Sequence, residues 1–413
     1  MNLTAFKNIY FLGVGGIGMS ALARYFNISG WNVVGYDKTP SPLTSHLEEE
    51  GISIHYVDQV SIFEENNFTP ENTLIVFTPA IPKYLGEYQF VLEQGFTVKK
   101  RAEVLGAITR ISKGLGVAGT HGKTTTSTML AHILNQSVIG CTAFLGGISA
   151  NFNSNLLINK NSDFTVIEAD EFDRSFLQLS PFASIITSCD PDHLDIYGDS
   201  SHFREGFEQY AAKIAQEGFC VQKYGMNLVT NAKSISYGLN EPLADAIAKN
   251  LEFSNGTFFM NVSYLGKEYK SIELGIPGVH NAENALACFI LCLELGLDER
   301  TIRAGLQTFK GVKRRFEYQI KSNDLVYIDD YAHHPTELKA LIDSLRLLYP
   351  NRKITGVFQP HLFSRTRDFQ DGFIEQLSRF DDTILMPIYP ARELPIEGVS
   401  SEVILAELTN ASN

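Results

Sequence analysis

The sequence is poor in cysteine, with five among 413 residues and no Cys-x-x-Cys pair. An odd number of thiols without paired spacing argues against a disulfide framework and against a zinc knuckle. Free cysteine is among the most buried residue types, so we expect the whole set to pack in the core. The five are Cys141, Cys189, Cys220, Cys288 and Cys292.

Positive charge and long apolar runs are scarce as well. The 34 Lys and Arg residues are outnumbered by 47 Asp and Glu residues, and the net charge of −13 repels a nucleic-acid backbone. No run reaches the ~18 apolar residues that a membrane span needs, and no basic segment precedes the apolar start at residues 9–18. We therefore expect a soluble cytoplasmic protein, a monomer or homodimer, with no nucleic-acid partner and no membrane insertion.

The overall composition is that of a packed globular protein. Hydrophobic residues make up 44% and charged residues 20%, which excludes wholesale disorder, collagen and coiled coil. At about 150 residues per domain, a chain of 413 residues is expected to form about three domains. The patterns described below place these domains at residues 1–107, 108–311 and 312–413.

The first domain opens with a β-α-β pattern. A strand at residues 9–12 is followed by a glycine turn at 13–18, a helix at 19–28 and a second strand at 31–36. Another apolar run at residues 73–77 continues the alternation. This order of elements is typical of a parallel sheet in an α/β fold.

The glycine turn itself fits a phosphate-binding motif. Gly13, Gly15 and Gly18 match G-x-G-x-x-G, and Asp37 ends the next strand, about where a ribose-binding acid lies. Unpaired amides and the helix dipole at such a turn favour a pyrophosphate. Taken alone, the motif suggests a nicotinamide or flavin enzyme, and a turn that merely requires glycine is the structural alternative.

A second phosphate-binding turn opens the next domain, after a strand at residues 114–118. This turn ends in Gly122-Lys123-Thr124, as a P-loop does, although strict Walker spacing requires glycine where Val117 stands. We expect the amides to bind the phosphates of a nucleoside triphosphate and the lysine to reach the β and γ oxygens. The residues expected at this nucleotide are Gly119, Thr120, His121, Gly122, Lys123, Thr124 and Thr125.

Acidic residues follow two apolar strands of this domain. Glu168-Ala169-Asp170-Glu171 ends the strand that starts at Phe164, and a second group at residues 189–195 follows the strand at 184–188. Mg²⁺ prefers hard oxygen ligands, and the carboxyl ends of adjacent strands share one crevice. Helix capping or a solvated turn explains any single acid, but explains the cluster poorly.

Two further patterns complete the α/β prediction. Residues 251–274 alternate apolar and polar around Asn255-Gly256, which predicts a hairpin in a small antiparallel sheet inserted before a helix at 281–295. The last domain again alternates strands with helices, and its first helix carries one apolar stripe. Its expected elements are strands at 325–328, 354–358 and 383–386 and helices at 335–348 and 369–377.

Seven short motifs also stand in one order along the chain. They lie at residues 119–126, 168–171, 192–195, 278–284, 314–316, 330–335 and 359–361. Together they resemble the signatures of the Mur ligases, and the likeness spans essentially the whole chain. It implies an α/β fold of three domains: an N-terminal Rossmann-like domain for a UDP-sugar, a central P-loop ATPase domain with a parallel and a small antiparallel sheet, and a C-terminal Rossmann-like domain.

The resemblance implies an amide-forming reaction. ATP phosphorylates the lactyl carboxylate of UDP-N-acetylmuramate with the help of Mg²⁺, and the amine of L-alanine attacks the acyl phosphate. The first glycine turn then binds the UDP pyrophosphate instead of a redox dinucleotide. The alternatives are a murein-recycling ligase that adds a tripeptide, an NAD-dependent oxidoreductase and an inactive nucleotide-binding module. The residues expected at the UDP-sugar are Gly15, Gly16, Ile17, Gly18, Met19, Ser20, Asp37 and Thr78.

The same likeness implies roles around the phosphates. Lys123 holds the transferring phosphate, Thr124 and Glu168 ligate one Mg²⁺, and His193 helps to place a second one near the acyl phosphate. In several Mur ligases a carbamylated lysine also holds metal. Phe207 stands at that position here, as expected for the branch that adds alanine.

Other implied roles belong to the side of the third domain. Asn281 and, less surely, His280 meet the adenine or anchor the loop beside it. Arg315 approaches the phosphates or the acyl phosphate when the domains close. His333 and Arg365 face the incoming amino acid, and the two-pronged donors of an arginine suit a carboxylate.

The end of the chain departs from the family pattern. Asn413 follows soon after residues 396–400, whereas family members run on through another strand and a glycine-rich loop. The resemblance therefore implies an incomplete third domain. An exposed sheet edge and apolar surface would make such a chain less stable or less active than a longer one.

Overall fold

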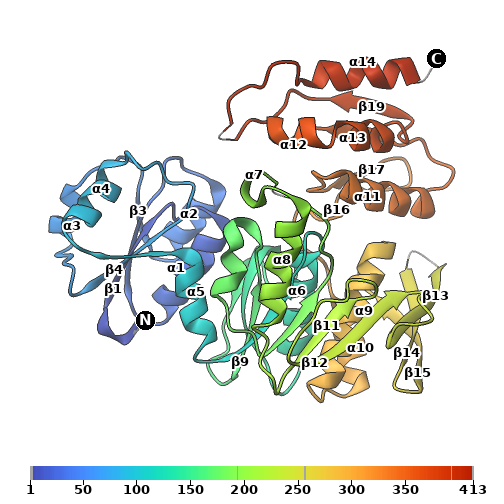
Figure 1. Ribbon diagram of the computed structural model, residues 1–413, viewed down its shortest axis with the longest axis horizontal. Helices are drawn as coiled ribbons and strands as arrows, with labels where there is room; N and C mark the ends of the chain where they lie inside the picture. Colours follow the sequence, from blue (N-terminus) through green and yellow to red (C-terminus); the bar gives the residue numbers. More distant parts are fainter. Residues whose placement is uncertain (1–2, 193, 255–256, 392, 412–413) are drawn as a thin grey trace.

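The computed structural model describes residues 3–192, 194–254, 257–391 and 393–411, which form three α/β domains (Figure 1). The N-terminal domain, in blue, lies beside the central domain, in green and yellow. The C-terminal domain, in orange and red, lies above the central domain in this view. The helix α5 (Arg101–Thr109) leads from the first sheet directly into the second.

The N-terminal domain is built on five parallel strands in the order β3-β2-β1-β4-β5. Its strands are apolar and largely buried, as expected for a parallel sheet covered by helices on both faces. Leu12 pairs with Tyr36 on one side and Phe77 on the other, so three strands end beside the glycine turn. The elements are β1 (Asn8–Leu12), α1 (Ile17–Ile28), β2 (Asn32–Tyr36), α2 (Pro42–Glu49), β3 (Ser53–His55), α3 (Ser61–Glu65), β4 (Thr73–Phe77), α4 (Gly86–Glu93) and β5 (Thr97–Lys100), after a short 3₁₀ turn η1 (Leu3–Ala5).

The central domain contains one sheet of ten strands in the order β15-β14-β13-β12-β11-β10-β6-β9-β7-β8. The phosphate-binding strand β6 lies in its middle, between β10 and β9. The elements are β6 (Lys113–Ala118), α6 (Lys123–Asn135), β7 (Thr142–Ser149), β8 (Ser154–Leu157), β9 (Phe164–Glu168), η2 (Phe172–Gln178), β10 (Ala183–Ile186), α7 (Leu194–Tyr197), α8 (Ser200–Ala211), β11 (Phe219–Lys223), β12 (Lys233–Leu239), β13 (Ala246–Ser254), β14 (Thr257–Tyr264), β15 (Lys267–Leu274), α9 (Val279–Glu294) and α10 (Glu299–Thr308).

The predicted small antiparallel sheet is not a separate sheet. Strands β13, β14 and β15 pair antiparallel as expected, and the predicted turn at Asn255-Gly256 lies outside the described residues. However, β13 also pairs parallel with β12, where Tyr237 faces Ala246. The hairpins therefore extend the parallel sheet, because β12 would otherwise present an unpaired edge.

The C-terminal domain departs from the single Rossmann-like sheet that was expected. Its described strands form two separate pairs: β16 with β17 antiparallel, and β18 with β19 parallel. Only a short turn joins β16 to β17, and a parallel crossover needs a dozen or more residues. The elements are β16 (Glu317–Lys321), β17 (Val326–Asp329), α11 (Pro335–Leu348), β18 (Thr355–Phe358), α12 (Phe363–Asp368), α13 (Gln370–Leu377), β19 (Asp382–Leu385) and α14 (Ser401–Ala411).

Burial agrees with most, but not all, of the cysteine prediction. Four cysteines are buried as free thiols, and Cys189 is half-buried instead, at the end of the segment that follows β10. One apolar core fills one face of the central sheet, while another runs from the N-terminal sheet into the central domain. Among the described residues, no helix combines the length and apolar character required to cross a bilayer.

Candidate active site

The second glycine turn lies at the carboxyl end of β6, as predicted. The strand ends at Ala118 and α6 begins at Lys123. Gly119 and Gly122 have φ angles of 140° and 80°, in the region that favours glycine. A Cβ at Gly119 would also collide with the hydroxyl of Thr187. The amides of the turn and of the first turn of α6 are thus gathered in one place, which suits a phosphate.

Lys123 is nearly enclosed, with 13% of its side chain exposed. Its Nζ lies 2.7 Å from Oε2 of Glu171 and donates to the carbonyl oxygens of Gly119 at 2.7 Å and Thr120 at 3.3 Å. Burial alone would lower the pKa of Lys123, but the negative charge of Glu171 raises it above its ordinary value. The ammonium group therefore stays charged beside the turn.

Glu168 ends β9 and contacts the phosphate-binding turn. Its Oε1 accepts a hydrogen bond of 3.1 Å from the hydroxyl of Thr124, and its Oε2 is buried without a hydrogen-bond partner. Burial raises the pKa of Glu168, against the opposing charge of Lys123. A Cβ at Gly146 on β7 would collide with this carboxylate. An unpartnered buried oxygen beside a threonine hydroxyl is a donor set that suits a hard cation.

The structure does not test the metal role expected for His193. His193 lies outside the described residues, and the described residues contain no group of three or more His, Cys, Asp or Glu side chains arranged to hold a metal. Phe207 is fully buried and packs edge-on against Phe176, at 5.3 Å between ring centroids. Its ring therefore belongs to the core.

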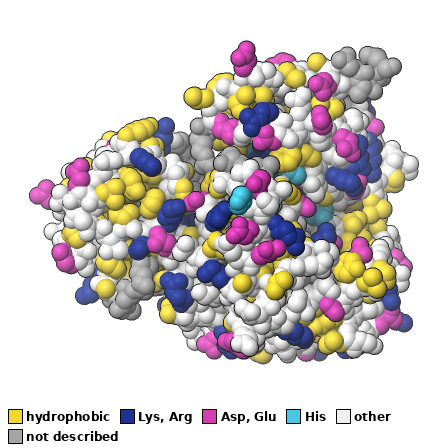
Figure 2. All heavy atoms as spheres, in the orientation of Figure 1, with side chains coloured by type: hydrophobic (Ala, Val, Ile, Leu, Met, Phe, Trp, Pro, Cys, Tyr) yellow, Lys and Arg dark blue, Asp and Glu magenta, His cyan; other side chains and the backbone are white. Residues whose placement is uncertain are grey.

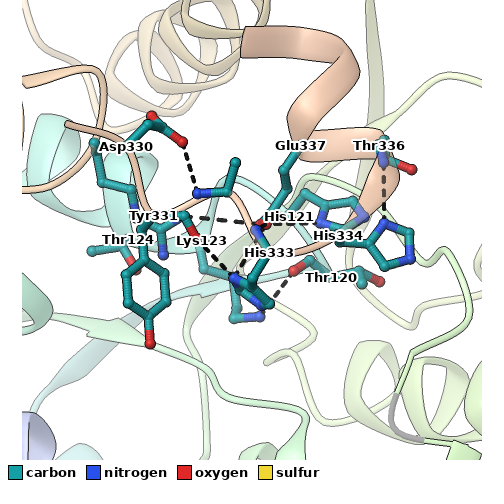
Figure 3. Close-up of polar contacts among 12 residues, drawn as sticks. Thr120, His121, Lys123, Thr124, Asp330, Tyr331, His333, His334, Thr336 and Glu337 are labelled. Carbon is teal, nitrogen blue, oxygen red and sulfur yellow. Dashed lines mark hydrogen bonds and ion pairs between the residues drawn. The ribbon is translucent and has the colours of Figure 1, made fainter. Parts of the chain in front are cut away.

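A cavity of about 330 Å³ lies between the central and C-terminal domains. Figure 3 shows side chains of the phosphate-binding turn facing those of the loop before α11. Thr120 and Lys123 belong to the turn but do not line the cavity themselves, whereas His121, Gly122 and Thr125 do. Other lining residues are Asn281, His280, Arg315, Asp330 and Glu337.

The start of α9 forms one wall of this cavity. Asn281 is 3% exposed, and its amide donates a 2.6 Å hydrogen bond to the carbonyl oxygen of Pro277. Asn281 thus anchors the preceding loop, one of the two roles expected for it. Burial lowers the pKa of His280 to about 4, and its Nδ1 is buried without a hydrogen-bond partner. A neutral imidazole with a free ring nitrogen can form a hydrogen bond with a nucleotide base or with an amide.

Glu337 was missed by the sequence analysis, although it joins the two domains. Its Oε1 lies 3.4 Å from Nδ1 of His121 and 3.9 Å from a guanidinium nitrogen of Arg315. Its Oε2 accepts a 2.9 Å hydrogen bond from the amide of His333 (Figure 3). Burial alone would raise the pKa of Glu337, but the hydrogen bond with His121 and the nearby positive charges hold it below its ordinary value. The sequence signal was a glutamate two residues after Pro335, at a helix start.

Asp330 fixes the backbone that carries Arg315. Its two carboxylate oxygens accept from the amides of Phe316 at 2.7 Å and Ala332 at 2.8 Å. Burial raises the pKa of Asp330 to about 6, although these amides and Arg315 act in the opposite direction. The guanidinium of Arg315 lies 4.9 Å from the ring centre of Tyr331. The arginine is thus held at the cavity wall by both neighbours.

His333 and Arg365 lie on the same side of the C-terminal domain. Nδ1 of His333 lies 3.0 Å from the carbonyl oxygen of Tyr331, and burial lowers the pKa of His333. The Arg365 side chain is 7% exposed, with one guanidinium nitrogen 3.5 Å from Oδ2 of Asp192 and another 3.4 Å from Nδ1 of His361. Its Nε is buried without a partner. A largely enclosed guanidinium with a free donor suits an anion.

A second cavity, of about 270 Å³, lies between the N-terminal and central domains. Five of the eight residues expected at the UDP-sugar line it, and Gly15, Ser20 and Asp37 do not. Its central-domain wall includes Glu168, which the phosphate-binding turn also contacts. The five are Gly16, Ile17, Gly18, Met19 and Thr78.

Asp37 supports the glycine turn from behind. Its Oδ2 accepts a 2.8 Å hydrogen bond from the amide of Gly15, and its Oδ1 accepts from the amide of Thr39 at 3.3 Å. Ser20 likewise bonds within α1, donating to the carbonyl oxygen of Ile17 at 2.9 Å. Both side chains shape the turn in this structure. The sequence motif alone did not distinguish this role from direct contact with a ligand.

Comparison with known proteins assigns the whole arrangement to one family. The family descriptions "Mur ligase family, catalytic domain", "Mur ligase middle domain" and "Mur ligase, glutamate ligase domain" match residues 8–113, 117–292 and 314–413. The chain belongs to the Mur ligase family. Because the first match covers the first glycine turn, the Mur ligase assignment replaces the alternative of a nicotinamide enzyme. Members of the Mur ligase family use ATP.

Individual relatives are similar along nearly the whole chain. The UDP-N-acetylmuramate–L-alanine ligase of Flavobacterium psychrophilum is 50% identical over 410 residues, which is 99% of this chain and 90% of that protein. The ligase of the same name from Porphyromonas gingivalis is 48% identical over 408 residues, or 98% of this chain and 90% of that protein. The expectation of an incomplete third domain finds no support in these matches.

Solved structures show the same fold. The crystal structure of UDP-N-acetylmuramate-alanine ligase MurC from Thermotoga maritima matches with a TM-score of 0.83 and 27% identity, over 98% of this chain and 89% of that one. A murein peptide ligase from Psychrobacter arcticus matches with a TM-score of 0.71 and 23% identity, over 98% and 88%. The second likeness supports the fold alone.

Proposed function

We propose that this protein is an ATP-dependent ligase that joins L-alanine to the lactyl carboxylate of UDP-N-acetylmuramate, in the synthesis of peptidoglycan precursors. The observation that carries the proposal is an identity of about one half, along nearly the whole chain, with ligases that bear this name. The two cavities support it, because Glu168 lines one and contacts the phosphate-binding turn beside the other.

The chemistry explains why two sites must meet. A carboxylate is a poor electrophile because its oxygen is a poor leaving group, whereas a phosphate leaves readily. The γ-phosphoryl group of ATP therefore has to reach the lactyl carboxylate before the amine attacks. Lys123, which the negative charge of Glu171 keeps charged, would neutralise the charge that spreads over the phosphoryl oxygens during transfer.

The residues present fit an Mg²⁺ ion. The Thr124 hydroxyl and the unpartnered Oε2 of Glu168 are hard oxygen donors close together, and we propose that they hold the ion. His193 is proposed to hold a second ion. When bound, the metal supplies positive charge that neutralises phosphate oxygens. The amides of Gly119 to Gly122 and of Thr125 would orient the phosphates, and Asn281 the loop beside the adenine.

The C-terminal domain would supply the amino-acid side of the reaction. We assign Arg365 to the carboxylate of L-alanine, because its buried Nε lacks a protein partner. His333, whose imidazole is neutral, would face the incoming amine. Arg315, which lines the nucleotide cavity, would contact the phosphates or the acyl phosphate on closure. Such closure excludes water from a labile intermediate.

The N-terminal domain would hold the sugar nucleotide. Gly16, Ile17, Gly18 and Met19 would present the start of α1 to its pyrophosphate, and Thr78 lines the same cavity. Gly15, Ser20 and Asp37 would keep the turn in shape, with direct contact to the ribose as a further role for Asp37. Because both nucleotide substrates are made inside cells, we propose that the enzyme acts in the cytoplasm. A monomeric or dimeric state stays a prediction.

The decisive experiment is phosphate release from Mg·ATP with UDP-N-acetylmuramate and a panel of acceptors. L-alanine is expected to support phosphate release. Release with a tripeptide but not with L-alanine would instead make the protein a murein-recycling ligase. No release with any acceptor, from a protein that binds both nucleotides, would reduce it to an inactive nucleotide-binding module.

A further inference from the structure

Arg101 lies against the first glycine turn, although it is far from that turn in sequence. It is the first residue of α5, directly after β5. A Cβ at Gly18 would come within 2.5 Å of its NH1 and 3.1 Å of its Cζ. In many dinucleotide-binding turns the third glycine allows close packing of helix and strand. Here the missing side chain of Gly18 makes room for a guanidinium group.

The surroundings of this guanidinium leave most of its donors free. Among the residues that line the second cavity, Arg101 is the one basic residue, and the two acids are Glu168 and Asp170. The ion pair found for it among the described residues is with Oδ2 of Asp170, at 3.5 Å. A charge-assisted hydrogen bond normally measures about 2.7–2.9 Å, so this pair is loose. The side chain is 25% exposed and opens onto the cavity.

The start of α1 supplies a second set of donors at the same place. Its N-cap residue, Gly16, makes no side-chain capping bond, so the first amides of this twelve-residue helix have no side-chain acceptor at the cap. The positive end of the helix dipole adds to their effect. The amides of α1 and the guanidinium of Arg101 therefore face the same part of the cavity, and both favour an anion.

We propose that Arg101 binds the pyrophosphate of the sugar nucleotide together with the start of α1. This inference rests on the proposed function and adds a residue that the glycine motif does not contain. The guanidinium contributes positive charge and planar hydrogen-bond donors, and the backbone amides contribute donors with a fixed direction. Asp170 faces the arginine across the boundary between the two domains, and their loose ion pair leaves the guanidinium beside Gly18 free to bind an anion.

Binding of UDP alone tests the proposal, because UDP carries the pyrophosphate but neither the sugar nor the lactyl carboxylate. Isothermal titration of the full chain is expected to show about 10- to 100-fold weaker binding of UDP to Arg101→Ala. Arg101→Lys should recover part of the affinity, since it keeps the positive charge but loses the paired planar donors of the guanidinium. Gly18→Ala should also weaken UDP binding, because its Cβ displaces the guanidinium.

Lys100→Ala is the matched control. Lys100 precedes Arg101, carries the same charge and also pairs across the domain boundary, with Asp173 at 2.7 Å, but it does not line the cavity. UDP affinity should change less than twofold in this variant. Circular dichroism and thermal unfolding establish whether each variant is folded. If one of the variants Arg101→Ala, Arg101→Lys and Gly18→Ala does not fold, the others still test the proposal.

The outcomes separate this inference from the proposed function. Unchanged UDP affinity in folded Arg101 variants would overturn it. So would a loss confined to UDP-N-acetylmuramate, because the arginine would then contact the lactyl carboxylate. If the wild-type chain binds UDP but shows no ligase activity, the proposed function fails while the role of Arg101 stands. Wild-type binding of neither UDP nor UDP-N-acetylmuramate would reject both.

Discussion

The central domain meets its two neighbours through interfaces of opposite character. Toward the N-terminal domain, one continuous apolar core contains Leu22 of α1 and Phe144 of β7, and the rings of Tyr25 and Phe144 lie 5.3 Å apart. Toward the C-terminal domain, Leu348 packs against the central core, and polar contacts such as Arg365 with Asp192 and His121 with Glu337 cross the boundary. The small C-terminal core contains residues of that domain alone.

This difference indicates which boundary moves. Separating an apolar interface exposes its whole surface to water at about 25 cal/mol per Å², whereas a few polar contacts can be exchanged for hydrogen bonds with water at a smaller net cost. Figure 2 shows histidine and charged side chains gathered below the C-terminal domain. We therefore expect the N-terminal and central domains to move as one body. The C-terminal domain is expected to open and close over the nucleotide cavity.

The largest expected effect is a loss of catalysis beside the boundary between the central and C-terminal domains, without a loss of UDP binding. Lys123→Ala should lower kcat at least about a hundredfold, because it removes the charge that stabilises the transferring phosphate. UDP affinity should stay within twofold of wild type, since the other cavity does not contain this lysine. Phosphate release and isothermal titration measure the two effects. Lys113→Ala, at the other end of β6, is the control, and substantial residual turnover in Lys123→Ala would refute the assignment.

The next effect is on stability at the apolar boundary. Asn155 is fully buried on β8, where its amide donates to the carbonyl oxygen of Ile17 at 2.6 Å and to the hydroxyl of Ser20 at 2.9 Å. It also accepts from Arg24. Asn155→Ala removes three hydrogen bonds from a fully buried position and should cost about 2–3 kcal/mol of unfolding free energy.

Urea unfolding checks this prediction, with Asn161→Ala as the control because Asn161 is exposed beyond the same hairpin. We also expect weaker UDP binding in Asn155→Ala, since Ile17 and Ser20 belong to the turn of the cavity. If Asn155→Ala loses less unfolding free energy than Asn161→Ala, the boundary does not depend on its polar contacts.

A smaller effect is expected at the link between the domains. Glu337→Gln keeps an acceptor for the amide of His333 but removes the charge that faces His121 and Arg315. Because the contacts of this carboxylate with His121 and Arg315 are long, at 3.4 Å and 3.9 Å, the unfolding free energy should fall by only about 1 kcal/mol. Closure of the C-terminal domain should be impaired more strongly, and kcat/KM should be about tenfold lower. Glu375→Gln, on exposed α13 surface, is the control; equal losses in the two variants would refute a role for the link.

The smallest effect is a dependence on pH. The pKa of Glu337 in the folded protein lies below its ordinary value of about 4.3, so the folded state favours the carboxylate. Its stabilising contribution is therefore complete above the ordinary value, begins to decrease below it, and is lost as the pH falls through the lower pKa of the folded state. The difference in thermal midpoint between wild type and Glu337→Gln should shrink from pH 7 to pH 4. A difference that grows on acidification contradicts the sign of this shift.

Local patterns predicted the structure of the two glycine turns well. Each consists of a buried strand, a glycine turn and a helix, and these features depend on neighbours in sequence. The strand predicted at residues 73–77 is β4, and the helix predicted at 335–348 is α11. The likeness to the Mur ligases extended this prediction to residues that are distant in sequence.

Contacts between distant segments could not be predicted in the same way. Arg101 and Glu337 gain their significance from Gly18 and His121, which lie on other domains or other elements. The parallel pairing of β12 with β13 was missed because periodicity identifies strands but not their partners. Register and pairing are decided by tertiary packing, which a single sequence does not display.

Glu168 links the surroundings of the two cavities through a single hydrogen bond, because its carboxylate lines one cavity and accepts from Thr124, next to the turn beside the other. A side chain at position 146 would collide with this carboxylate. We therefore expect a substitution of Gly146 to disturb both cavities at once.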